Sequence, residues 1–305
     1  MSGRQPPRRG NRGAAAPTTP RSRVVRAPLL LGGLALVIGA LVAVTILSTR
    51  RSDVATPWAR LGTADVHSLA FVGNDPNHVL FGHHGGILES RDGGHTWQPL
   101  PIGADAMGMR PAADGSIVIA GHLVFTASHD NGKTWQSIAA QDLPNLDIHG
   151  FARDPSDPAR MWAALATGGL WESGDFGIHW TRVREDNVLL PVAVRSANTT
   201  RLIAITAAGL EASDDGGRSW TPIPTPPTYP MTALSATPDG KVMYAGSLDL
   251  LYRSDDSGHS WSPTSYKGSA FAIATSEDGR TVALVSQGTE YFRSTDGGQT
   301  WPGPR

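Results

Sequence analysis

The 305 residues could form one large all-β domain or two ordinary domains, and the lack of cysteine excludes disulfides, thiolate metal sites and thiol nucleophiles. Charged residues make up only 17%, against 35 glycines, 23 prolines and 9 tryptophans, a profile typical of short strands joined by turns. Residues 1–51 hold nine arginines and no lysine, aspartate or glutamate, which leaves 17 basic and 27 acidic residues in 52–305, a net charge of −10 that argues against nucleic-acid binding.

The first 56 residues divide into three segments. Residues 1–26 are rich in proline, glycine and arginine, with few apolar residues to bury, so we expect them to be disordered. Residues 27–47 contain no charge and are long enough to cross a bilayer, whereas a cleaved signal peptide has a shorter apolar core of about 7–15 residues. We therefore predict an uncleaved transmembrane signal anchor at 27–48 and a linker at 49–56.

The arginines predict the orientation of this anchor. Seven precede the apolar span and two follow it, and cytoplasmic flanks carry the excess of positive charge. We expect the N-terminal tail in the cytoplasm and the remainder of the chain outside the membrane, at the cell membrane as a single-pass protein.

An eight-residue motif then recurs six times: SRDGGHTW, SHDNGKTW, SGDFGIHW, SDDGGRSW, SDDSGHSW and STDGGQTW. We call these motifs the octapeptides. Their central aspartates are Asp92, Asp130, Asp175, Asp215, Asp256 and Asp296, and their tryptophans are Trp97, Trp135, Trp180, Trp220, Trp261 and Trp301. A period near 40 residues indicates stacked or radially repeated units.

Each period contains four short apolar or alternating runs separated by turn residues, which predicts a four-stranded antiparallel sheet. The octapeptide falls between the third and fourth runs. Its serine and aspartate side chains can accept backbone N–H groups, and the glycine two residues after the aspartate can adopt a positive φ. The tryptophan then starts the fourth strand, so we expect its ring to be part of the core between sheets.

The octapeptides resemble the Asp-box, or BNR, repeat of sialidases, sortilin-type receptors and the photosystem II assembly propeller. The resemblance extends over roughly residues 58–301 and implies a β-propeller. The chain resembles in particular the membrane-anchored bacterial propellers often labelled glycosyl hydrolases. In these families the boxes lie at the periphery of the blades, away from the binding face, which implies a structural and not a catalytic role. The third octapeptide has Phe176 and His179 at unusual positions, so we expect a looser turn there.

The two ends of the repeat region predict how the ring closes. Trp301 is followed only by PGPR, which is too short and proline-rich for a good fourth strand, whereas Trp58 matches a post-octapeptide strand with no octapeptide before it. We expect residues 57–62 to supply the outer strand of the last blade, because closure removes free sheet edges. The predicted fold is an all-β, six-bladed β-propeller over 57–305.

Ten histidines divide by their place in the repeat. Four lie in octapeptides and His78 lies in a turn between first and second strands. The other five lie in loops of blades one to three, at the end of the blade opposite the octapeptides. They are His67, His83, His84, His122 and His149. Neutral imidazoles converging there, with Asp65 and Asp147 adjacent, could bind zinc or copper. Alternatively, each histidine separately caps a loop.

A glycosidase would need two facing carboxylates or a tyrosine nucleophile. The candidates on the same face are Asp147, Glu185, Tyr229 and Tyr266. The nearest match to the Phe/Tyr-Arg-Ile-Pro motif of sialidases is ARDP at residues 152–155, which aligns with a turn on the opposite face. The preferred prediction is therefore a membrane-anchored binding or assembly module for a protein or glycan ligand. A sialidase-like glycoside hydrolase and a metal-binding propeller remain as alternatives.

Overall fold

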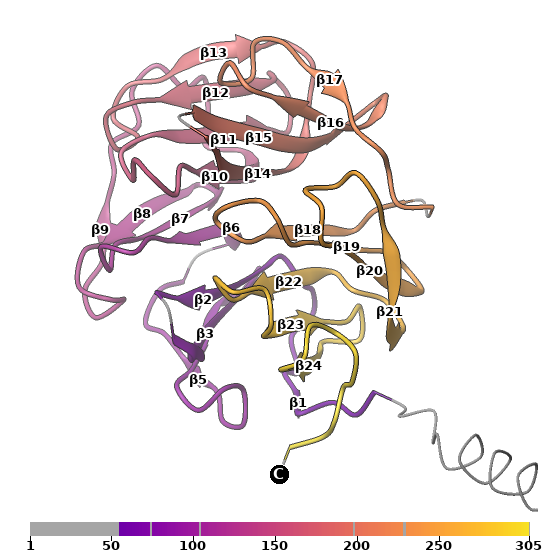
Figure 1. The fold of residues 1–305 in the computed structure, drawn as a ribbon. Helices are drawn as coiled ribbons and strands as arrows, with labels where there is room; N and C mark the ends of the chain where they lie inside the picture. Colours follow the sequence, from indigo (N-terminus) through magenta and orange to yellow (C-terminus); the bar gives the residue numbers. More distant parts are fainter. Residues whose placement is uncertain (1–54, 74, 104, 198, 228–229, 305) are drawn as a thin grey trace, which may run out of the picture. The chain divides into compact units, whose positions relative to one another are not determined.

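The structure, a computed structural model, describes residues 55–304 apart from 74, 104, 198 and 228–229, and these residues form six four-stranded antiparallel sheets (Figure 1). The innermost strands follow one another around a closed ring, with β2 next to β6, β6 next to β10, and so on through β14, β18 and β22 back to β2. The protein is therefore a six-bladed, all-β propeller, as the repeat period predicted.

Each of the first five blades uses four consecutive strands. The strands of blades one to three are β2 (Ser68–Val72), β3 (Asp75–His83), β4 (Gly86–Ser90), β5 (Gln98–Pro99), β6 (Asp105–Pro111), β7 (Ile117–His122), β8 (Val124–Ser128), β9 (Gln136–Ser137), β10 (Ile148–Arg153), β11 (Met161–Leu165), β12 (Leu170–Ser173) and β13 (Thr181–Arg184). Those of blades four and five are β14 (Leu189–Ser196), β15 (Thr199–Thr206), β16 (Gly209–Ser213), β17 (Thr221–Pro222), β18 (Ala233–Ala236), β19 (Met243–Gly246), β20 (Leu250–Ser254) and β21 (Ser262–Lys267).

The sixth blade joins both ends of the ring, as the sequence predicted. Its strands are β22 (Ala272–Thr275), β23 (Val282–Val285), β24 (Glu290–Ser294) and, from the start of the ring, β1 (Ala59–Arg60). β1 pairs antiparallel with β24, with Ala59 opposite Tyr291, and the backbone N–H of Trp58 donates to the Tyr291 carbonyl at 2.7 Å. Because this strand comes from the other end of the chain, no blade has to be completed by the short segment after Trp301.

The hydrophobic core lies between neighbouring blades. One cluster combines Ile203 and Leu210 of blade four with Met243 and Tyr252 of blade five, and the next joins blades five and six. The alternation of side chains along each strand places one apolar face against each neighbouring sheet, so every blade is covered on both sides.

The octapeptides form the bends between third and fourth strands, with the bonds that their composition predicts. In the first copy, Ser90 Oγ accepts from the Gly94 N–H at 2.8 Å, and Asp92 Oδ1 accepts from the N–H groups of His95 and Thr96 at 3.0 and 2.9 Å. The glycine two residues after the aspartate has φ between 82° and 103° in all six copies. Each bend is thus stabilised by bonds within itself.

The expectation of a looser third turn was wrong. The His179 N–H donates to Asp175 Oδ1 at 2.9 Å, and His179 Nδ1 lies 2.7 Å from Asp175 Oδ2, where the other copies place a serine or threonine hydroxyl. Phe176 takes the positive φ of 63° that this position needs, and its ring lies under the Arg153 guanidinium at 5.0 Å. The imidazole therefore replaces the hydroxyl as the partner of the carboxylate.

The octapeptide tryptophans are buried to different depths. Trp180 and Trp301 are 3% and 1% exposed and belong to the core, whereas the other four are half-buried. In five copies the indole Nε1–H donates to the carbonyl of the octapeptide's own second glycine position, at 2.8 to 3.2 Å. Trp261 instead donates to the Pro224 carbonyl of the preceding blade at 2.9 Å.

The octapeptides should make the propeller sensitive to acid. The pKa of all six central aspartates is lowered: burial acts in the opposite direction, most of all at Asp92 and Asp296, but hydrogen bonds to the carboxylates outweigh it. For Asp175, bonds from the backbone and side chain of His179 lower it to about 2, and for Asp256, bonds from the side chain and backbone of Ser260 lower it to about 2. A lowered pKa in the folded state stabilises the fold above the ordinary carboxyl pKa of about 3.9, and this stabilisation is lost as the pH falls toward the folded value. The melting temperature should therefore fall steeply between about pH 4 and pH 2. Calorimetry across this range would check it, and an equal slope in Asp256→Asn would contradict the assignment to the octapeptides.

No helix among the described residues is long and apolar enough to cross a membrane. The expected disordered tail (1–26) and transmembrane anchor (27–48) lie outside the described residues, as does the expected linker up to residue 54.

Candidate functional site

Four histidines and three aspartates meet on the face of the ring opposite the octapeptide bends. We call this face the top face, and we call the seven residues the histidine cluster: Asp65, His67, His84, Asp105, His122, Asp147 and His149. The first strand of each blade begins on this face and the second strand ends on it. The cluster residues therefore lie close together although they come from three adjacent blades. They lie before β2, after β3, at the start of β6, at the end of β7 and at the start of β10.

The strand ends in blade two are held unusually close. Asp105 pairs with His122 across the ladder, and a register shift follows between Asp105 and Gly108. A Cβ atom added to Gly121 would lie 1.7 Å from the Asp105 carbonyl oxygen. Only glycine at position 121 lets the two strands approach so closely, and this approach places the Asp105 carboxylate beside the His122 ring.

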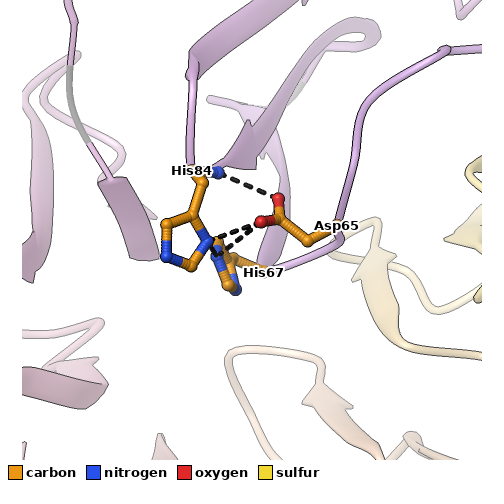
Figure 2. Close-up of side chains that lie close together, drawn as sticks. All are labelled: Asp65, His67 and His84. Atoms are coloured by element: carbon orange, nitrogen blue, oxygen red, sulfur yellow. Dashed lines mark hydrogen bonds and ion pairs between the residues drawn. The ribbon is translucent and has the colours of Figure 1, made fainter.

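The first group in the cluster consists of Asp65, His67 and His84 (Figure 2). His84 Nδ1 lies 2.5 Å from Asp65 Oδ2 and 2.7 Å from His67 Nε2. The His84 backbone N–H also donates to Asp65 Oδ1 at 2.9 Å. As Figure 2 shows, both imidazoles point a ring nitrogen toward the same carboxylate.

The second group consists of His122, Asp147 and His149. His122 Nε2 lies 2.7 Å from His149 Nε2, and Asp147 Oδ1 lies 3.0 and 3.1 Å from these two nitrogens. The arrangement repeats that of the first group, with two imidazole nitrogens and one carboxylate oxygen facing one another.

Asp105 lies between the two groups. Its Oδ1 is 3.3 Å from His67 Nε2 in the first group, and its Oδ2 contacts His122 Nδ1 in the second group and lies 3.4 Å from His84 Nε2. The side chain is only 9% exposed, and Oδ1 is buried without a hydrogen-bond partner among the described residues. A buried carboxylate oxygen without such a partner is costly, so this atom marks a place where a ligand would stabilise the protein.

The environment favours the neutral form of His67 and the ionised form of Asp65. Burial lowers the pKa of His67, and the nearby Asp105 and Asp65 offset this only in part, so the neutral ring with a free lone pair is favoured. Burial alone would raise the pKa of Asp65, but hydrogen bonds from the His84 backbone N–H and ring lower it below its ordinary value. Neutral imidazole and ionised carboxylate are the forms that coordinate metals.

Four of the five histidines expected at this site are in the cluster, and His83 is not. The His83 ring stacks on Phe81 with centroids 5.9 Å apart, and its Nδ1 accepts from the Gly85 N–H at 3.0 Å. His83 therefore caps its own loop, which is the alternative role considered for each histidine.

Asp105 was not among the expected ligands, although the sequence contains a signal for it. Blades one and three open with Asp65-Val-His67 and Asp147-Ile-His149, and blade two opens with Asp105-Ala-Met107 at the same place in the repeat. Aligning the starts of the three blades would have placed Asp105 beside the two aspartates already considered.

The weak catalytic candidates do not gather at one place. Asp147 belongs to the cluster, whereas Glu185 is exposed and pairs with Arg182 at 3.0 Å. Tyr266 was wrongly expected in a top-face loop. It lies in β21, with its ring buried 5.2 Å from those of Phe292 and Trp301, because its position in the strand turns it toward the core. Tyr229 lies outside the described residues.

The cluster stands at one mouth of the central channel. A cavity of about 50 Å³ lies below it, bordered by His67, His149 and Arg110, and a larger cavity of about 210 Å³ follows toward the other face. Arg110 borders both cavities, and its guanidinium donates to the Met109 carbonyl at 2.8 Å. Burial lowers the pKa of Arg110 to about 10.

The chain is similar to two curated proteins that are both named as assembly proteins. The chain is 28% identical over 188 residues to the Photosystem II assembly protein Ycf48 of Synechococcus sp. strain JA-2-3B'a(2-13), covering 56% of this chain and 53% of that protein. It is 24% identical over 288 residues to the protein of the same name in strain JA-3-3Ab, covering 87% of this chain and 84% of that protein. The match thus spans about half the length of the first relative and most of the second.

Among solved structures, the GH74 xyloglucanase of Xanthomonas campestris matches with a TM-score of 0.54 and 20% identity, over 81% of this chain and 46% of that one. At this identity the likeness concerns the fold alone. No protein-family model matches the sequence.

Proposed function

We propose that this protein is a protein-binding module that assists the assembly of a membrane protein complex. The support comes from the two similar proteins, both named as assembly proteins, one of which aligns over most of its length. In this proposal residues 27–47 anchor the propeller to the membrane, with the ring on the outer side, because of their apolar length and the arginines before them.

The top face is the surface we assign to the partner, and the observation that carries this is the placement of exposed leucines. Leu123, Leu189 and Leu248 are 90%, 55% and 51% exposed, and all three lie where first strands begin or second strands turn into third strands. Burial of such apolar side chains against a partner would be favourable. Leu123 directly follows His122, so this apolar position adjoins the histidine cluster.

The partner consistent with this surface is a protein segment that offers apolar side chains to the leucines. Leu123 is held outward with φ of 56°, and its N–H donates to the Leu146 carbonyl at 2.8 Å. A leucine with a positive φ has a strained backbone, and here the side chain is not buried in return. A docked partner would bury it.

Site-specific photo-crosslinking in native membranes tests this proposal. A photoreactive amino acid at position 123 should crosslink to a defined membrane protein. The same residue at 178, which replaces an isoleucine 42% exposed in an octapeptide bend on the opposite face, should not. The crosslink should be lost in Leu189→Asp together with Leu248→Asp, and blue-native gels should then show the partner's complex incompletely assembled. Equal crosslinking from 123 and 178, or a fully assembled complex in the double variant, would overturn the proposal.

A further inference from the structure

We propose that the histidine cluster binds two divalent transition-metal ions of the zinc class, one at Asp65, His67 and His84 with Asp105 as a further ligand, and one at His122, Asp147 and His149, where Asp105 holds the outer nitrogen of the His122 ring. The inference does not rest on the proposed assembly role, since it follows from the side chains alone.

The composition of each group fits such an ion. Two imidazole nitrogens and one carboxylate oxygen form a donor set common for Zn²⁺, and the ligand atoms of each group lie within 4.8 Å of one another. A tetrahedral zinc ion with ligands at about 2.0–2.2 Å spans ligand separations of about 3.3–3.6 Å, so small ring rotations are sufficient. His84 and His149 are both partly exposed and free to make such rotations.

The close imidazole pairs point to the same conclusion. His67 and His84 place ring nitrogens 2.7 Å apart, and so do His122 and His149. Two such nitrogens can approach so closely only if one carries a proton for the other or both face a shared cation. A bound metal ion would use both lone pairs and release the shared proton to solvent.

Asp105 provides the independent observation. It is the most buried carboxylate of the cluster, its Oδ1 faces the first group without a hydrogen-bond partner among the described residues, and its Oδ2 faces the second. Oδ1 is therefore placed to bind the first ion, near His67 Nε2. Oδ2 lies against His122 Nδ1, the ring nitrogen opposite the Nε2 that faces the second ion, and a carboxylate in this position orients a histidine ligand. The two outer groups share no residue, so both ions can be held at once. A single ion at His84, Asp105 and His122 would leave four residues of the cluster without a metal: Asp65, His67, Asp147 and His149.

The test measures metal content of the full-length chain, prepared in detergent without a polyhistidine tag, stripped with chelator and equilibrated with Zn²⁺. Mass spectrometry of the metal should give two zinc ions per chain. His84→Ala and His149→Ala should each reduce this to one, and the double variant to none. His83→Ala is the matched control, because His83 is adjacent to His84 in the same loop but caps that loop instead, and it should retain two.

Asp105→Asn keeps the shape of the side chain and should weaken the binding of both ions by about 10- to 100-fold, measured by calorimetric titration. Circular dichroism of each variant verifies the fold, and the Co²⁺ absorption spectrum of each single variant should retain one tetrahedral centre. Absence of bound zinc, equal loss in His83→Ala and His84→Ala, or a single ion unaffected by His149→Ala would overturn the proposal.

Discussion

Replacing Trp301 by alanine should lower the free energy of unfolding by about 3–5 kcal/mol, the range for removal of a buried tryptophan. The ring is 1% exposed, packs beside Tyr266 in the core between blades five and six, and donates its Nε1–H to the Gly298 carbonyl. Since each kcal/mol shifts the melting temperature of a domain this size by about 2–4 °C, the expected decrease is about 6–20 °C. Denaturant unfolding of residues 52–305, followed by circular dichroism, measures it.

Trp261→Ala is the matched control, because the same position in the preceding octapeptide carries a half-buried ring that bonds to Pro224 and not to its own turn. Its loss should be clearly smaller than that of Trp301→Ala. If the two variants unfold at the same denaturant concentration, burial of the octapeptide ring does not determine its contribution to stability.

Replacing Trp58 by proline should open the ring of blades where β1 pairs with β24. It should lower the free energy of unfolding by about 3 kcal/mol, because the packing of a half-buried indole and one backbone hydrogen bond are lost. The Trp58 N–H donates to Tyr291, its indole Nε1–H donates to Pro302 at 2.8 Å, and its ring lies 4.6 Å from that of His95 in the first octapeptide. Proline removes the donor and the ring together. The exposed edge of β24 should then exchange its amide hydrogens faster and promote association of the protein.

Trp58→Phe retains the backbone N–H and an aromatic ring, so it should lose distinctly less stability. Hydrogen exchange followed by mass spectrometry separates the two variants. Unchanged protection of residues 290–294 in Trp58→Pro would show that β1 does not hold the ring closed.

The propeller could be predicted from the sequence because its determinants are local or repeated. The serine and aspartate bonds of each octapeptide join atoms within four residues, so Ser90, Asp92 and Gly94 specify a bend locally. The six copies then report the number of blades. The ring closure was readable from the unmatched Trp58 for the same reason, since an incomplete repeat at one end needs its complement at the other.

Local patterns also misled at two positions. His179 was read as a departure from the motif, yet its imidazole reaches the Asp175 carboxylate as a hydroxyl does elsewhere. Tyr266 was expected in a solvated loop, yet the strand continues through it and its ring enters the core beside Trp301. Residue type alone did not reveal which atoms each side chain could reach.

The sequence by itself determined the architecture and the face on which the candidate site would lie. The order of strands in a repeated blade decides, for every loop, on which of the two faces of the ring it lies. Only the tertiary structure decided which residues meet there. His83 and His84 are neighbours in the chain, but only His84 faces the cluster. The close approach of two strands at Gly121 places Asp105 between the two groups. Such convergence depends on the directions of the side chains and on the spacing between neighbouring sheets. No local sequence pattern determines either of them.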